Sequence, residues 1–231
     1  MDYPPIAAHG LIGDLQTAAL VTTGGTVDSK SFSYGRLMSS VAFDRAIRIA
    51  AAGGRPADSG RWTAVRDRPY DAVINKGWNR ALKAFARSEG SDVLDTSGLL
   101  MLATGLISPA DEKRISTLAA IEKTLVPDSL VYRYDPKASP DGLRGSEGTF
   151  SLCTGWYADA LTRSNRLDEA QLVVAMMLTY ANHVGLFSEE IGLTGDQLGN
   201  FPQAFTHLSL INAAVNLDRH LDCRPIELAA A

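Results

Sequence analysis

Residues 147–182 read EGTFSLCTGWYADALTRSNRLDEAQLVVAMMLTYAN, and this stretch decides the fold class. Its two halves, 147–164 and 168–182, have the apolar spacing of three and four residues that is typical of helices. Only the short run from Asn165 to Asp168 separates them, which predicts an antiparallel helical hairpin. The second half is apolar nearly all round, so we expect that helix to be deeply buried.

Helical patterns extend toward the N-terminus. The apolar spacing predicts a helix over 34–52 that ends at Gly53, followed by a helix that Ser59 caps. Residues 108–111 (Ser-Pro-Ala-Asp) have the order typical of a helix start, and they precede a predicted helix over 111–125.

The C-terminal part contains one more predicted helix. It is expected to begin at Asn200, a good N-cap, with Gln203 at the position of a capping-box partner. Residues three and four apart give it one candidate buried face: Phe201, Phe205, Leu208, Ile211 and Val215. Between the helices, residues 127–146 have a loop composition, interrupted by a strand-like run at 130–134.

The N-terminal residues 1–28 differ from the rest. The run LVTTGGTVD at 20–28 predicts a strand, a Gly-Gly turn and the start of a second strand. A lone hairpin is only marginally stable in water, so it needs a surface to pack on. We therefore expect three parts: an N-terminal β segment at 1–28, a helical domain at 29–222 and a tail at 223–231.

With a short apolar helix at 97–106, the sequence predicts seven helices. Joined as antiparallel hairpins, they fit two architectures, an α-solenoid and part of an α/α toroid. No fixed-period repeat is found in the sequence, which weakens the solenoid. Long irregular loops on alternate connections favour the toroid, because such loops hold binding residues on a rigid scaffold.

The composition excludes several classes of protein. The 231 residues are 45% hydrophobic and 21% charged, as in folded domains, and a net charge of −4 argues against a nucleic-acid partner. No apolar run reaches the roughly 18 residues of a membrane helix, and the start lacks a secretory pattern. We therefore expect no membrane partner and a cytoplasmic location. Cys153 and Cys223 lie far apart and the histidines show no ligand spacing, so we expect neither a metal site nor a cofactor.

One segment combines residues that carry chemistry. Residues 185–207 place two carboxylates, Glu189 and Glu190, after an aromatic residue and before a Gly-rich loop. A carboxylate held between apolar walls can act as a general base. The alternative is that both are solvated loop charges, and spacing alone favours this alternative.

Several segments in a fixed order resemble one family. They are 31–46 (SFSYGRLMSSVAFDRA), 90–95 (GSDVLD), 130–134 (LVYRY), 147–156 (EGTFSLCTGW) and 185–207. Together they resemble glycoside hydrolase family 15, the glucoamylase and bacterial trehalase-like family, over about residues 31–220. Residues 6–28 resemble the opening of the N-terminal β-sandwich of its prokaryotic members. The implied fold is mainly α: a partial (α/α)6 toroid of antiparallel helix hairpins, with a short β-hairpin remnant of the sandwich.

The resemblance also implies a chemistry. The family hydrolyses α-glucosidic bonds with inversion, using one acid that protonates the leaving oxygen and one carboxylate that activates water. It assigns the general base to Glu189. The residues that it places near the substrate are Glu147, Trp156, Glu190, Tyr34 and Arg36. The alternatives are a loop charge for Glu147 and a core position for Trp156, and the pattern favours the core position.

The general acid is missing from this pattern. The family carries it in an Ile-Trp-Glu type motif before the Phe-Ser-Tyr segment, where this chain reads TVDSKSF (26–32) and where no Trp-Glu pair occurs. Asp28 is the acidic residue nearby, but it fits the sandwich hairpin better, and Ser40 stands at the position of a family tryptophan. The resemblance thus implies an internally shortened member that joins the start of the sandwich to the second half of the toroid.

Two functions are compatible with these features. The first is an inverting hydrolase of α-glucosides or trehalose-like carbohydrates, weak or inactive as this chain because general acid catalysis contributes about 10²–10⁴-fold. The second is a non-catalytic sugar-binding or helical interaction module. Because half a toroid exposes apolar helix faces, we also expect self-association.

Overall fold

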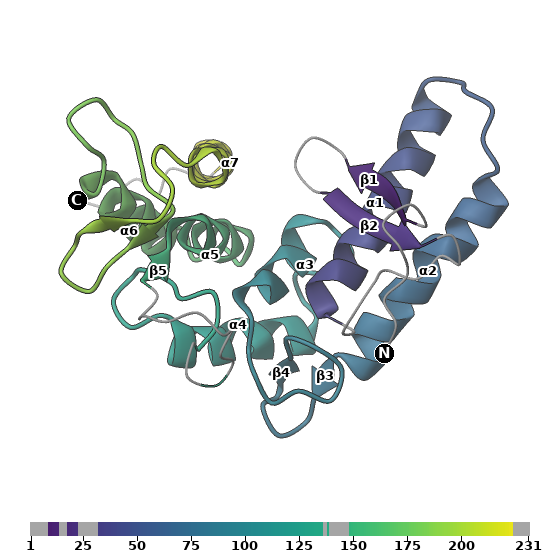
Figure 1. Cartoon of the computed structure of the whole chain (residues 1–231), viewed down its shortest axis with the longest axis horizontal. Coiled ribbons are helices and arrows are strands. Elements are labelled where there is room, and N and C mark those ends of the chain that lie inside the picture. Colours follow the sequence, from purple (N-terminus) through teal and green to yellow (C-terminus); the bar gives the residue numbers. More distant parts are fainter. Residues whose placement is uncertain (1–8, 14–17, 23–31, 136–137, 139–147, 224–231) are drawn as a thin grey trace, which may run out of the picture. The chain divides into compact units, whose positions relative to one another are not determined.

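The computed structural model describes residues 9–13, 18–22, 32–135, 138 and 148–223. Within these ranges the chain folds mainly into helices and its strands are short, which confirms the mainly α fold class (Figure 1). The chain divides into two compact units, Met1–Val93 and Leu94–Ala231. None of the described helices is long and apolar enough to cross a membrane.

A β-hairpin lies at the start of the first unit. Strand β1 (His9–Gly13) pairs antiparallel with β2 (Ala18–Thr22), with Leu11 opposite Leu20. The strand predicted from Leu20 onward is therefore confirmed, but the partner found for it precedes it in the chain. The predicted turn at Gly24 and the strand after it lie outside the described residues.

A helical hairpin follows in the same unit. Its elements are α1 (Ser33–Ala52) and α2 (Ser59–Lys76), followed by β3 (Trp78–Asn79) and β4 (Ala84–Phe85). Helix α1 ends at Gly53, as predicted. The cap of α2 is Asp58 and not Ser59, because the Asp58 carboxylate accepts the Arg61 N–H at 3.0 Å. The apolar spacing of α1 also includes Ile49, but this side chain is 70% exposed.

The second unit is built around one central helix. Its elements are η2 (Thr96–Leu99), α3 (Leu100–Ala103), α4 (Glu112–Leu125), β5 (Thr149–Phe150), α5 (Ser151–Arg163), α6 (Leu167–Thr179), β6 (Glu190–Ile191), β7 (Gln197–Leu198) and α7 (Ala204–Asp222). Helix α5 packs against α6, α7, η2 and α3 (Figure 1). The three short strands form an antiparallel sheet in the order β5-β6-β7.

The start of α4 was predicted correctly, whereas the strand before α5 was not. Asp111 caps α4 by accepting hydrogen bonds from two backbone N–H groups of the first turn. The run 130–134 forms no named strand. Its backbone makes isolated hydrogen bonds to separate elements, such as the bond from the Tyr132 N–H to the Leu125 carbonyl at 2.9 Å.

The α5–α6 hairpin is confirmed, with two corrections. Helix α5 begins at Ser151 and not at 147, because the two residues before it pair with β6. Helix α6 is not buried all round: Leu172, Met176 and Leu178 are exposed. Only one stripe of α6 packs inward, on Leu167, Ala170, Val173 and Met177. An apolar sequence therefore did not imply full burial.

Helix α7 buries the face opposite to the predicted one. It begins after Gln203, so Asn200 is not its N-cap. The predicted buried face (Phe201, Phe205, Leu208, Ile211 and Val215) is 43% to 57% exposed. The residues that are buried on α7 are Thr206, Ser209, Leu210, Ala213 and Leu217. Small side chains let α7 come close to α5, and this approach decides which face is covered.

The closest approach of α5 and α7 is at Gly155. A Cβ atom at this position would lie 2.5 Å from Oγ and 2.8 Å from Cβ of Ser209. We expect Gly155→Ala to lower the free energy of unfolding by about 1–3 kcal/mol through overpacking. This clash outweighs the roughly 0.5–1 kcal/mol that alanine gains over glycine inside a helix. Urea unfolding followed by circular dichroism measures the change.

A matched double variant checks the cause. Ser209→Gly removes the two closest of the three contacting atoms and leaves the backbone carbon at 3.0 Å, so Gly155→Ala should cost clearly less in the Ser209→Gly background. Equal losses in both backgrounds would show that the contact with Ser209 is not responsible.

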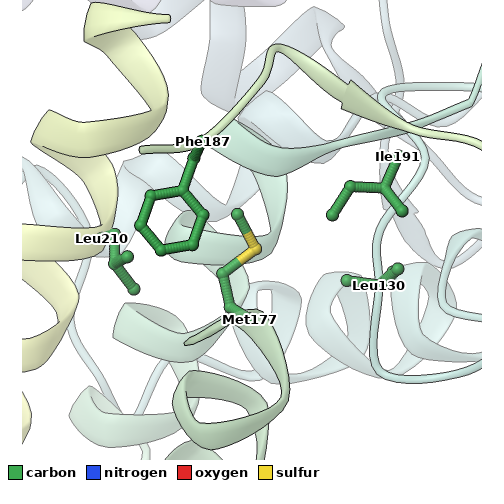
Figure 2. Close-up of a cluster of buried hydrophobic side chains, with 5 residues drawn as sticks. All are labelled: Leu130, Met177, Phe187, Ile191 and Leu210. Carbon is green, nitrogen blue, oxygen red and sulfur yellow. The ribbon is translucent and has the colours of Figure 1, made fainter. Parts of the chain in front are cut away.

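A compact apolar cluster lies between α6, α7 and the loops of this unit. Figure 2 shows Phe187 beside Met177 and Leu210, with Ile191 and Leu130 close together. All of these side chains are buried. Since Phe187 and Ile191 are both in the cluster, the three residues between them are fixed at both ends.

Candidate active site

The candidate site lies at the N-terminal end of α5, where residues 187–191 cross it. The Ser151 N–H, at the start of α5, donates to the Glu189 carbonyl at 3.0 Å. Ser188 is buried: its hydroxyl donates to the Glu190 carbonyl at 2.7 Å, and its carbonyl accepts the Thr206 hydroxyl at 3.0 Å. These bonds give the two glutamates a fixed backbone.

Glu189 is half-buried and contacts the loop before α7. Its Oε2 accepts two hydrogen bonds from Asn200, from the backbone N–H at 3.0 Å and from the side-chain Nδ2 at 2.8 Å. The Glu189 N–H in turn donates to the Asn200 carbonyl at 3.0 Å. The carboxylate is therefore held in one orientation, as a base that acts on a bound substrate requires.

Glu190 is also half-buried, but its side chain is held by a different element. It lies on β6, and its Oε2 accepts the Gly148 N–H at 2.9 Å, next to β5. Burial raises the pKa of Glu190, the Gly148 hydrogen bond lowers it, and the nearby charge of Glu189 raises it again. The net direction is upward. This upward direction does not separate the two glutamates as candidate bases, because a catalytic carboxylate is often tuned upward as well.

An arginine and a tryptophan lie in the same unit. The Arg133 guanidinium lies 5.5 Å from the ring centroid of Trp156, which is half-buried on α5. Nε of Arg133 pairs with Asp95 at 2.9 Å, and the same Asp95 oxygen accepts the Ser97 N–H at 2.8 Å. Trp156 thus lies at the edge of the core, with part of its ring exposed. Planar guanidinium and indole groups of this kind bind sugar hydroxyls and sugar faces.

Arg133 and Asp95 were not among the predicted site residues. Both lie in segments that carried the family resemblance, LVYRY and GSDVLD, and this was the available signal. Their pairing joins two segments far apart in the sequence, and only the structure shows it.

The remaining predicted site residues lie in the first unit or outside the described residues. Tyr34 and Arg36 lie on α1 in the first unit, where Arg36 donates to Glu89 at 3.0 Å. This guanidinium lowers the pKa of Glu89. Glu147 and Asp28 lie outside the described residues.

No metal cluster is found: within the described ranges, no three histidine, cysteine or acidic side chains come together. His207 packs its ring edge-on against Phe187, with centroids 5.4 Å apart, and its Nε2 accepts the Phe187 N–H at 3.3 Å. Cys153 is buried and burial raises the pKa of its thiol. His207 thus holds the backbone at Phe187, and Cys153 is a buried core residue. An open hollow of about 410 Å³ is lined by Arg163 and His220, at the opposite end of α5 from the glutamates.

Comparison with known proteins identifies relatives of this chain. The sequence model of "Glycosyl hydrolases family 15" matches residues 26–173 and 164–215. The chain is 38% identical over 195 residues to a trehalase of Thermoplasma volcanium, which covers 84% of this chain and 31% of that protein. It is 37% identical over 194 residues to a trehalase of Mycolicibacterium smegmatis, covering 83% and 29%.

Solved structures show the same fold at lower identity. A glycosidase in complex with glucose superposes with a TM-score of 0.70 at 18% identity, covering 84% of this chain and 53% of that one. A bacterial glucoamylase complexed with acarbose gives 0.67 at 17% identity, covering 83% and 34%. These likenesses confirm part of an (α/α)6 glycosidase toroid.

The fold is thus that of the helical-toroid glycosidases. The chain belongs to family 15 of the glycosyl hydrolases, as the resemblance predicted. It spans about a third of the length of the curated trehalases that it matches.

Proposed function

We propose that this chain carries the general-base half of an inverting glycoside hydrolase of glucoamylase or trehalase type, acting on α-glucosidic bonds. The observation that carries the proposal is the position of Glu189: half-buried, clamped by Asn200, and fixed between the buried side chains of Phe187 and Ile191. In the proposed reaction, Glu189 takes a proton from a water molecule as that water attacks the anomeric carbon. The bond to the leaving oxygen breaks on the opposite face of the sugar.

The leaving oxygen needs a proton, and the family's donor motif has no counterpart in this sequence. We therefore propose that this chain alone hydrolyses ordinary glucosides weakly or not at all, because general acid catalysis contributes about 10²–10⁴-fold. We propose that residues 29–222 form the hydrolase domain, between the β segment 1–28 and the tail 223–231.

The proposed substrate is trehalose or another α-glucoside. Two relatives are named trehalases, and two solved structures hold glucose or acarbose. Within the second unit, the Trp156 ring with Arg133 offers a platform for a sugar, and Glu190 lies beside the base. Glu147, Tyr34 and Arg36 remain proposed contacts on the resemblance alone.

The cytoplasm remains the proposed compartment. It is supported by the free thiols of buried Cys153 and exposed Cys223, since oxidising compartments favour disulfides.

The test of the proposed function is glucose release by the purified chain from trehalose, maltose and maltooligosaccharides. Proton NMR of the first product identifies its anomer, and the proposal requires β-glucose because the mechanism inverts. Glucose release is expected to be weak and to fall further in Glu189→Gln. Measurable release that Glu189→Gln leaves unchanged would overturn the assignment of Glu189 as the base.

A second candidate function, an interaction module, is favoured by the exposed face of α7. We propose that two copies of this chain pair through the α7 stripe, defined as Phe201, Phe205, Leu208, Ile211 and Val215. The stripe has the spacing of three and four residues with which helices pack on one another, so it complements a second copy of itself.

Charging this stripe should keep the chain monomeric. Phe205 and Leu208 are 52% and 43% exposed, and we expect Phe205→Glu with Leu208→Glu to raise the dimer dissociation constant by about tenfold or more, which is 1.4 kcal/mol. Sedimentation equilibrium over a range of concentrations measures it. Ile115→Glu, which adds a charge at a 51% exposed residue of α4, is the control. An unchanged constant in the double variant would show that the stripe is not the interface.

A further inference from the structure

We propose that Asn200 is the positioning residue of the catalytic base, holding Oε2 of Glu189 so that Oε1 is the oxygen that accepts the proton from water. This inference rests on the proposed role of Glu189 and deepens it, because it assigns the reacting oxygen and the residue that selects it.

The first observation is that both donors of one residue reach one oxygen. The Asn200 backbone N–H lies 3.0 Å from Oε2 of Glu189, and its Nδ2 lies 2.8 Å from the same atom. Within the described part of the chain, no group donates to Oε1. A carboxylate held in this way cannot rotate without losing two charge-assisted bonds, so its two oxygens have different roles.

The second observation is the close approach of the loop at Gly199. This residue has φ of +73°, a conformation that favours glycine. A Cβ atom there would lie 2.9 Å from Oε2 and 3.0 Å from Cβ of Glu189. The backbone before Asn200 is thus packed directly against the carboxylate, on the side of Oε2.

The sheet explains why Asn200 is in reach. Strand β6 pairs with β7, and Glu190 lies opposite Leu198. The pairing of these two segments continues to the hydrogen bond between the Glu189 N–H and the Asn200 carbonyl at 3.0 Å. Asn200 is therefore fixed opposite Glu189 by backbone pairing, although it lies eleven residues away in sequence.

Glu190 does not compete for these donors. Its Oε2 is held by the Gly148 N–H at 2.9 Å. The two neighbouring carboxylates thus have separate partners, Asn200 for Glu189 and the Gly148 N–H for Glu190.

An NMR titration tests the contact without any need for turnover. The backbone and side-chain amide signals of Asn200 should shift when the pH is lowered from about 7 to about 3, the range in which carboxylates take up protons. In Glu189→Gln this shift should disappear, while in Glu190→Gln it should remain. Asn200 signals that do not titrate in the wild-type chain, or that still titrate in Glu189→Gln, would overturn the proposal.

Kinetics test the consequence. Asn200→Ala keeps the backbone donor and removes Nδ2. With α-glucosyl fluoride as the substrate, we expect kcat to fall about tenfold to a hundredfold with little change in KM. Asn200→Asp replaces the donor by a carboxylate of the same shape and should lower kcat further. Gln197→Ala, which removes a bond to the Tyr180 carbonyl and does not contact Glu189, is the control.

The two proposals fail in different ways. If Asn200→Ala retains the wild-type kcat, the positioning role is wrong while the general base stands. If the wild-type chain does not turn over even α-glucosyl fluoride, whose leaving group needs no proton donor, the proposed function fails, and the amide titration still decides whether Asn200 holds Glu189.

Discussion

Replacing Glu189 with glutamine is expected to slow hydrolysis of α-glucosyl fluoride by about 10²–10⁴-fold, the usual contribution of a general base. Fluoride leaves without a proton donor, so this substrate needs the base but not the missing acid. Glutamine keeps the size of the side chain and an oxygen that can accept the bonds from Asn200, but it cannot take a proton from water. Fluoride release, measured with an ion-selective electrode, follows the reaction.

Two matched variants make this result specific. Glu112→Gln changes an exposed glutamate on α4 and should leave the rate unchanged. Glu190→Gln should reduce the rate less than Glu189→Gln, because the Glu190 side chain is bound to Gly148. A larger loss for Glu190→Gln than for Glu189→Gln would reverse the assignment of the base.

Phe187→Ala is expected to lower the free energy of unfolding by about 3–5 kcal/mol, which is the usual cost of emptying a buried phenylalanine site. Phe187 is 5% exposed, lies in the cluster of Figure 2 and packs against the His207 ring. It also starts the segment that carries the glutamates. The variant should therefore lose stability and fluoride release together, and urea unfolding measures the first effect.

Leu172→Ala is the control for this substitution. It also shortens a large apolar side chain, but Leu172 is 69% exposed on α6, and we expect a change within about 0.5 kcal/mol. Similar losses for both variants would contradict the assignment of Phe187 to the core of this unit.

Local signals in the sequence predicted much of the helical framework. The helix over 34–52, its end at Gly53 and the Asp111 cap of α4 were correct, because each depends on residues within one or two turns. The hairpin of α5 and α6 was correct for the same reason. The position of β1 and the late start of α5 were not predicted, since both depend on strand pairing with other segments.

The faces of α6 and α7 show why a helical period does not by itself predict which side chains are buried. The period correctly finds a stripe of large apolar side chains on α7, but it does not show whether another element covers that stripe. Here the covered face contains Ser209 and Ala213, whose small size permits close packing on α5. Burial was decided by the neighbour and not by hydrophobicity.

For the candidate site, the family segments predicted the place but not the contacts. Glu189 and Glu190 were singled out from the sequence, and the structure gives each its own partner. The partners Asn200 and Gly148, and the pair of Arg133 with Asp95, come from loops whose approach has no periodic signal. The sequence pattern predicts a helix cap at Asn200, because asparagine is favoured at an N-cap, whereas in the structure the residue binds Glu189.

The pairing of β5 with β6 has a consequence for how the site is assembled as the chain folds. The Gly148–Glu190 and Thr149–Ile191 bonds each join residues 42 positions apart, whereas α5 and α6 are joined by a short local turn. Contacts of long sequence separation carry the larger loop-closure entropy and so tend to form after local ones. The helical hairpin is therefore expected to form before the glutamates reach their places. An ordered pair of carboxylates would then mark a second unit whose folding is complete.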